Sequence, residues 1–209
     1  MSDEWPEALE RGVAGAPLEG HSRSGDLAVF VGTARGGLAC VIDGLGHGDP
    51  AADAAATAAE VVRAHAESPV QEMLDACHAA LQRTRGVVMT LASFDLARSE
   101  LSWTGVGNVE ARLVRAGDGP GARFDSPLVF AGALGYSLPR VKPHTVPFAP
   151  GDAVVFVTDG IEPDFSGVLA GSVAAQQLAE RVYARHGRGT DDALAVVVRY
   201  SPEPLGGPA

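Results

Sequence analysis

An acidic turn directly after a buried strand constrains this chain more than any other stretch. Residues 38–42 are apolar and mostly branched, which is typical of a buried strand, and the strand ends on Asp43. Three glycines follow at alternate positions, so the backbone here can approach a ligand closely. We expect Asp49 to cap a helix that begins at Pro50. An acid at the tip of a rigid strand, beside such backbone, suits a hard metal ion.

Two further motifs place carboxylates against the ends of apolar strands. Asp159 follows one expected strand, and Asp191 and Asp192 precede another. Each motif alone is an ordinary turn signal. Their joint occurrence, with Asp26 at the start of a fourth strand, is not explained by turn chemistry. In an antiparallel sandwich such strand ends can lie at one rim, where the carboxylates repel one another unless cations neutralise them.

The ligand atoms in these motifs are oxygens, which favours Mg²⁺ or Mn²⁺ over Zn²⁺. Two such ions about 3.5–4 Å apart can share a water, lower its pKa and direct it at a phosphorus atom. This chemistry needs no protein nucleophile, and the sequence has neither a Gly-x-Ser-x-Gly turn nor a P-loop. Cys40 and Cys77 are expected to be small buried thiols.

Composition excludes several other classes of protein. The net charge of −10 argues against a nucleic-acid partner and against an anionic membrane surface. No apolar run approaches the roughly 18 residues that a membrane-spanning helix needs. The first residues lack the basic and apolar regions of a signal peptide. We therefore expect a cytoplasmic protein that binds neither nucleic acid nor membrane.

The order of elements predicts an α+β fold, a sandwich of antiparallel sheets with helices outside. We expect one domain over residues 10–200, a flexible leader over 1–9 and a disordered tail over 201–209. Residues 127–150 are expected to be irregular and to form a surface loop over a site. The expected strands cover residues 11–16, 27–32, 38–42, 87–94, 101–106, 109–115, 153–157 and 194–200, and the expected helices 50–66, 70–83 and 173–185. We expect strands 27–32 and 38–42 to pair as a hairpin, and Ser68 and Ser172 to cap the second and third helices.

The three acidic motifs resemble those of the metal-dependent protein phosphatases, the PPM superfamily. They are most similar to its SpoIIE-like branch, and within that branch to the small stressosome phosphatase RsbX. The motifs are Val-Ile-Asp-Gly-Leu-Gly-His-Gly at 41–48, Val-Thr-Asp-Gly-Ile at 157–161 and Thr-Asp-Asp-Ala-Leu at 190–194. Similar stretches also lie at 24–26, 85–87, 105–109 and 127–139, in the order and spacing of the family.

This resemblance implies an α-β-β-α sandwich with two Mn²⁺ or Mg²⁺ ions in a cleft between the sheets. By position, Asp43 would bridge both metals and the carbonyl of Gly44 would bind one of them. Asp159 and Asp191 would complete the shell of the other. These residues would act in catalysis through a water bound between the metals.

Other positions match the family less directly. Asp26 resembles the acid that holds metal-bound water, and Asp192 resembles either a residue that supports the ligands from behind or a spare ligand. Many relatives carry an acid where Gly25 stands, so one metal would be held mainly through water.

A histidine directly after Asp-Gly protonates the leaving group in proposals for eukaryotic members. His47 lies further along, and we favour a loop-positioning role for it. Arg23 contacts substrate phosphate or is an ordinary exposed loop residue.

The implied activity is that of a serine/threonine protein phosphatase. Its implied partners are phosphorylated STAS-domain scaffold proteins and anti-sigma antagonists of bacterial signalling. Two alternatives stay open from the sequence. The same fold with a degraded metal site would be a binding module for a phosphoprotein, and a third possibility is hydrolysis of a small phosphate ester.

Overall fold

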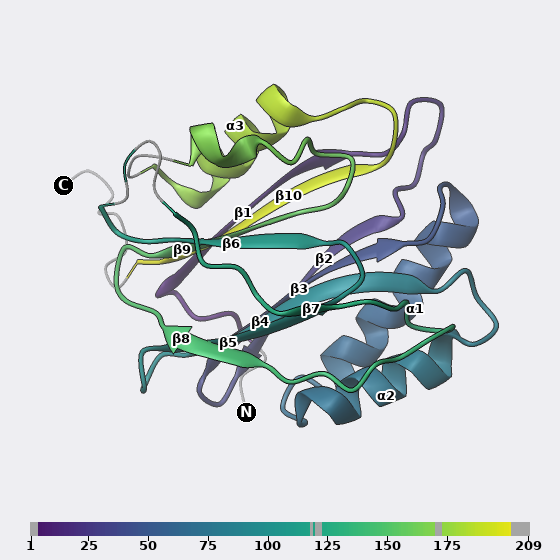
Figure 1. The fold of residues 1–209 in the computed structure, drawn as a ribbon, viewed down its shortest axis with the longest axis horizontal. Coiled ribbons are helices and arrows are strands. Elements are labelled where there is room, and N and C mark those ends of the chain that lie inside the picture. Colours follow the sequence, from purple (N-terminus) through teal and green to yellow (C-terminus); the bar gives the residue numbers. More distant parts are fainter. Residues whose placement is uncertain (1–3, 118, 120–122, 170–172, 202–209) are drawn as a thin grey trace.

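Two β-sheets pack face to face between outer helices, and together they make four layers (Figure 1). The computed structural model describes residues 4–117, 119, 123–169 and 173–201. Helices α1 and α2 cover the outer face of one sheet, and α3 covers the outer face of the other. The arrangement confirms the predicted α-β-β-α sandwich.

The first sheet has the strand order β1-β10-β9-β6, and the second has the order β2-β3-β4-β5-β7, with β8 also pairing with β5. All pairs are antiparallel except β5 with β7, which is parallel, so the predicted antiparallel sheets hold with this one exception. The strands are β1 Leu9–Ala16, β2 Asp26–Thr33, β3 Gly36–Gly44, β4 Val87–Asp95, β5 Glu100–Val106, β6 Glu110–Val114, β7 Val129–Phe130, β8 His144–Pro147, β9 Ala153–Val157 and β10 Ala193–Tyr200.

The helices match the predicted ones closely in position. They are α1 Asp49–Ala64, α2 Val70–Leu81 and α3 Ala175–His186, with a short 3₁₀ helix at Phe165–Val168 that was not predicted. The buried face of α1 is almost entirely alanine, which lets the helix approach the sheet closely. In the described part of the chain, none of these helices has the length and apolar character needed to cross a membrane.

The predicted helix caps differ from the observed ones. The N-cap of α1 is Gly48 rather than Asp49, which lies in the first turn. Gly48 has φ of 73°, a conformation that glycine adopts without steric cost, so the chain turns into the helix one residue early. The N-cap of α2 is Pro69 rather than the preceding serine, and that of α3 is Ala174. Ser172, the expected cap of α3, lies outside the described residues.

The beginning of the chain is packed where a flexible leader was expected. The Trp5 ring meets Phe30 edge-on at 5.2 Å between centroids and Phe94 at 6.4 Å. Leu9 is 1% exposed and begins β1. The leader prediction is therefore wrong for residues 5–9, because these apolar side chains cover one end of the layer between the sheets. Of the expected tail, residues 202–209 lie outside the described part.

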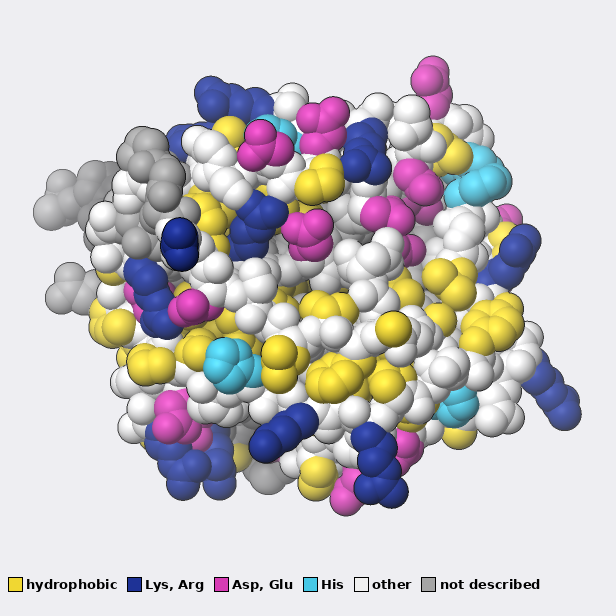
Figure 2. Space-filling view, viewed as in Figure 1, with side chains coloured by type: hydrophobic (Ala, Val, Ile, Leu, Met, Phe, Trp, Pro, Cys, Tyr) yellow, Lys and Arg dark blue, Asp and Glu magenta, His cyan; other side chains and the backbone are white. Residues whose placement is uncertain are grey.

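The segment over residues 127–150 is more regular than expected, because β7 and β8 add it to the edge of the second sheet. Leu134 also exchanges two backbone hydrogen bonds with Val87 at the start of β4. Leu128, Val129 and Tyr136 stay exposed. Figure 2 shows apolar side chains in a band across the middle of this face.

Three apolar layers fill the spaces between the four layers of secondary structure. Trp103, Phe94, Phe148 and Phe156 lie in the layer between the sheets and are fully buried. This large central layer fixes how the two sheets sit on each other. It therefore also fixes which strand ends meet at each rim of the sandwich.

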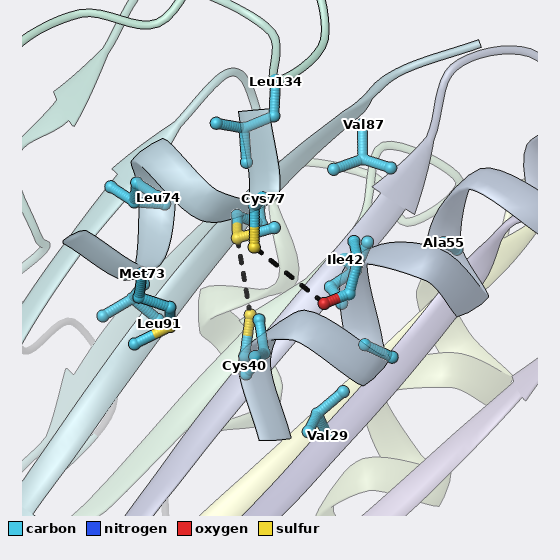
Figure 3. Packing of buried hydrophobic residues seen from close by; sticks show 14 of the residues in the cluster. Val29, Cys40, Ile42, Ala55, Met73, Leu74, Cys77, Val87, Leu91 and Leu134 are labelled. Carbon is cyan, nitrogen blue, oxygen red and sulfur yellow. Dashed lines mark hydrogen bonds between the residues drawn. The ribbon is translucent and has the colours of Figure 1, made fainter. Parts of the chain in front are cut away.

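Both cysteines lie in the layer between the second sheet and helices α1 and α2 (Figure 3). Both are free and buried. The Cys40 Sγ lies 3.8 Å from the Met89 Sδ, and the Cys77 Sγ lies 4.0 Å from the carbonyl oxygen of Ala58. Burial raises the pKa of both thiols. They are small apolar core residues, as the sequence predicts.

Candidate active site

Asp26 and Asp43 lie side by side at one rim of the sandwich. They are direct partners in the antiparallel pairing of β2 with β3, at the start of one strand and near the end of the other. Side chains alternate along a strand, so Asp43 points to the same face as Val41, which is buried between the sheets. Asp26 is 8% exposed and Asp43 is half-buried. Two carboxylates thus enter the space between the sheets from the second sheet.

Thr158 connects this pair to the first sheet. Its Oγ1 donates a hydrogen bond to Asp26 Oδ2 at 2.6 Å and accepts one from the Leu194 N–H at 2.9 Å. Thr158 follows β9, Leu194 belongs to β10, and Asp26 begins β2. The hydroxyl therefore joins three strands from both sheets and fixes the rotamer of Asp26.

The remaining predicted acids lie on the first-sheet side of the same rim. Asp159 and Asp191 are exposed, and both lie near enough to act electrostatically on Asp26 and Asp43. Asn108, just before β6, donates to Asp159 Oδ2 at 3.1 Å. Asp191 Oδ1 accepts the Asp192 N–H at 2.8 Å. Acidic side chains gather at the upper right of Figure 2.

Burial and mutual repulsion favour the neutral forms of the inner pair. Burial raises the pKa of Asp43 to about 8, and the charge of Asp26 is the next largest cause. Burial also raises the pKa of Asp26 to about 7, although the hydrogen bond from Thr158 opposes this shift. Within the described residues, no Arg, Lys or His forms an ion pair with any acid of this rim.

The donor chemistry of the rim fits hard divalent cations. Its ligating side chains are carboxylates, and their unbalanced charge is the kind that a cation neutralises. As the side chains lie, no three His, Cys, Asp or Glu residues of the described ranges are close enough together to hold a metal ion. A hard divalent ion here would therefore be held by one or two of these carboxylates, with backbone carbonyl groups and water completing its shell.

The backbone behind the rim is packed without room for side chains. The Gly44 N–H donates to the carbonyl oxygen of Gly25 at 3.0 Å. A methyl group on Gly44 would lie 2.3 Å from the carbonyl oxygen of Ala51 in α1, and one on Gly25 would lie 3.2 Å from Asp192 Oδ2. An acidic side chain at position 25 would meet these neighbours.

Arg23 and His47 lie on the outer side of the rim, and both are exposed. Arg23 Nη2 lies 2.8 Å from Asp53 Oδ1, and its Nη1 lies 3.4 Å from Asp49 Oδ1. His47 packs against His21 with 5.1 Å between ring centroids. Arg23 is thus engaged with the first turns of α1, and the ring contact of His47 agrees with a loop-positioning role.

A family model described as stage II sporulation protein E (SpoIIE) matches residues 34–201. The chain belongs to the SpoIIE family. The match covers all three acidic motifs, and it confirms the predicted branch of the PPM superfamily. The SpoIIE-family protein is accordingly a serine/threonine protein phosphatase.

Solved structures of similar fold match almost the whole sandwich. One structure is described with the words "The bacterial stressosome: a modular system that has been adapted to control secondary messenger signaling". It is 26% identical to this chain, and the match covers 91% of this chain and 99% of the other, with a TM-score of 0.82. RsbX in complex with magnesium is 24% identical over 95% and 98%, with a TM-score of 0.81. The PP2C phosphatase domain of SpoIIE from Bacillus subtilis is 20% identical over 94% and 64%, with a TM-score of 0.71. No curated protein sequence matches.

Sequence reasoning about the SpoIIE-family protein missed two polar residues of the site. Thr158 holds Asp26, and Asn108 holds Asp159. Thr158 has a usable signal, because strand periodicity places it on the same inner face as Phe156. Asn108 has only the signal of a turn residue, so its contact with a distant acid is visible in the structure alone.

Asp192 binds the loop over residues 17–25 at both ends. Its Oδ1 accepts the Leu18 N–H and its Oδ2 accepts the Gly25 N–H, both at 2.7 Å. Asp192→Ala would leave these two amides without acceptors and should lower the free energy of unfolding by about 2–4 kcal/mol. Urea denaturation measures this, and hydrogen exchange should rise in the loop. The exposed Asp164→Ala serves as a control, and equal stability of the two variants would contradict this role of Asp192.

The raised pKa values predict how the stability of the metal-free SpoIIE-family protein depends on pH. The ordinary pKa of both carboxyl groups is 3.8, and the folded-state pKa values are about 7 for Asp26 and about 8 for Asp43. Between these pH values the folded protein holds more protons than the unfolded chain. The free energy of unfolding should therefore fall as the pH rises from about 5 to about 8. Urea denaturation with a chelator present tests this. A double variant, Asp26→Asn with Asp43→Asn, should lose most of the slope, and an unchanged slope would contradict the assignment.

Proposed function

We propose that this SpoIIE-family protein removes phosphate from phosphoserine or phosphothreonine on a bacterial signalling protein in the cytoplasm, using two Mn²⁺ or Mg²⁺ ions. The observation that carries the proposal is the meeting of four strand-end acids at one rim with no balancing cation from the described residues. The magnesium complex of RsbX supports the choice of metal. The stressosome description of one relative supports a partner in a bacterial signalling assembly. Among such partners we propose a phosphorylated STAS-domain or anti-sigma antagonist protein, the substrate that the sequence resemblance implies.

The ions would be held by the Asp43 carboxylate, the Gly44 carbonyl and the carboxylates of Asp159 and Asp191. When bound, such ions lower the pKa of a water and neutralise charge on the phosphoryl oxygens. No covalent protein intermediate is required.

The other residues of the rim support this site. Thr158 occupies Oδ2 of Asp26, which leaves Oδ1 to accept a hydrogen bond from water between the sheets. Asn108 orients Asp159 in the same way. Asp192 has both oxygens engaged by backbone N–H groups, so it holds the loop against the rim rather than acting as a ligand. A contact between Arg23 and the substrate phosphate stays a prediction.

Phosphate release from a phosphorylated STAS protein tests the proposal. Release should require Mn²⁺ or Mg²⁺, stop with a chelator, and be faster than release from small phosphate metabolites at equal concentration. Preference for a metabolite would contradict the protein substrate. Tight phosphoprotein binding without phosphate release would contradict the enzymatic role and favour the binding module.

A further inference from the structure

A cavity of about 370 Å³ opens directly beside the acidic rim. Its walls come from the end of β1 with the loop that follows, from the last turn of α3, and from the start of β10. Asp191, which we place among the metal ligands, is part of the wall. A group bound in this cavity would therefore lie beside the metal site that we propose.

The cavity has the electrostatic character of a cation site. Its charged lining residues are Glu19 and Asp191, both exposed, and no Arg or Lys of the described residues lines it. Because we assign the Asp191 carboxylate to the metal ions, Glu19 is the lining residue whose charge is left for another cation. Ala184 in the last turn of α3 and the C-cap residue Gly187 are part of the lining, and the carbonyl groups at a helix C-terminus carry partial negative charge. Arg185 and Arg188 are near in sequence but are not in the lining.

The rest of the lining is apolar and suits a long side chain. Pro17 and Ala184 supply aliphatic wall, and Tyr183 supplies a partly buried aromatic ring. Lys and Arg side chains pack their aliphatic stems on such surface and keep the charged end near carboxylates or an aromatic ring. A second cavity, about 450 Å³, lies among Arg35, Asp95 and other residues of both signs, and it shows no such preference.

The position of Glu19 relative to the rim is fixed by its neighbour. The Leu18 N–H donates to Asp192 Oδ1 at 2.7 Å, and Asp192 directly follows Asp191. The loop that carries Glu19 is thus attached to the same turn as the proposed metal ligand. This attachment keeps Glu19 close to the proposed metal site.

We propose that this cavity binds a Lys or Arg side chain of the phosphoprotein substrate, a few residues from the phosphorylated serine or threonine. This proposal rests on the proposed function and adds a determinant of substrate choice. An extended chain spans about 3.3–3.6 Å per residue, so a basic residue within a few positions of the phosphate reaches the cavity. Glu19 pairs with the charged end of this side chain and so selects basic substrates, and the Tyr183 ring packs against its aliphatic stem.

The test compares phosphopeptides that differ only in one basic residue, moved through the positions around phosphoserine or replaced by norleucine. At one position the basic peptide should bind roughly tenfold more tightly and have a correspondingly higher kcat/KM. Glu19→Gln should reduce this preference roughly threefold, and Glu19→Lys should reverse it toward peptides with Glu at that position. Glu60→Gln, on the exposed face of α1, should change nothing.

Hydrolysis of p-nitrophenyl phosphate, which has no side chain for the cavity, should be equal in all these variants. Equal binding of basic and norleucine peptides, or a preference that survives Glu19→Lys, would overturn the proposal. Because peptide binding is measured separately from turnover, the two proposals can fail separately. A charge preference without any hydrolysis would support the cavity and contradict the enzymatic function, and hydrolysis without a preference would do the reverse.

Discussion

Asp43→Ala is expected to lower phosphatase turnover at saturating Mn²⁺ by about a thousandfold or more, the loss that follows from removing several kcal/mol of metal-ion stabilisation. Asp43 is the one acid that enters the rim from the end of β3 and faces every other acid of the site. Its removal takes away the ligand proposed to be shared by both ions. Steady-state phosphate release from a phosphoserine peptide measures the effect.

The folded state of this variant should be intact. Burial and repulsion oppose the charged form of Asp43, so the metal-free protein should not lose stability when the carboxylate is removed. Asp43→Asn keeps the shape and should lose as much activity. Asp75→Asn, on the exposed face of α2, is the matched control. Activity near the parent level in a folded Asp43→Ala protein would contradict the assignment.

Gly160→Ala is expected to have the second large effect, through the backbone. A methyl group on Gly160 would lie 2.0 Å from the carbonyl oxygen of Asp192 and 2.8 Å from the Ala193 Cα. The turn after β9 would have to separate from the start of β10, which moves Asp159 away from Asp191. Overpacking of this kind costs about 1–3 kcal/mol, and we expect turnover to fall with stability.

Gly167→Ala is the control for this substitution, because a methyl group there would have no atom within 4 Å. Thermal unfolding and p-nitrophenyl phosphate hydrolysis should be unchanged in the control and reduced in Gly160→Ala. Equal behaviour of the two variants would show that neither stability nor turnover needs close packing of the turn after β9 against the start of β10.

The acids of the site could be predicted from the sequence because their signal is local. Asp43 and Asp159 each end an apolar strand, and Asp26 begins one, so strand patterning alone places them at strand ends. The pairing of Asp26 with Asp43 follows from the predicted hairpin. The meeting of the two sheets depends on packing around Trp103 and its neighbours, which no local pattern encodes.

The contacts that support the site could not be predicted, because they join segments that are far apart in the sequence. Asp192 accepts N–H groups from Leu18 and Gly25, which are far away in the sequence. Which N–H groups Asp192 meets depends on where β1 and β2 lie relative to β10 in the folded protein. The packing of Trp5 was missed because a short polar N-terminal stretch has the composition of a loose leader, whereas its aromatic ring finds a place against Phe30.

Calorimetric titration of the chelator-treated protein with Mn²⁺ tests the central claim most directly, since it measures whether the rim holds metal at all. We predict two ions per chain for the parent protein, and loss of at least one of them in Asp43→Ala with Asp75→Asn unchanged. Absence of Mn²⁺ binding in the parent, or binding that Asp43→Ala leaves untouched, would contradict the claim that these acids form a metal centre.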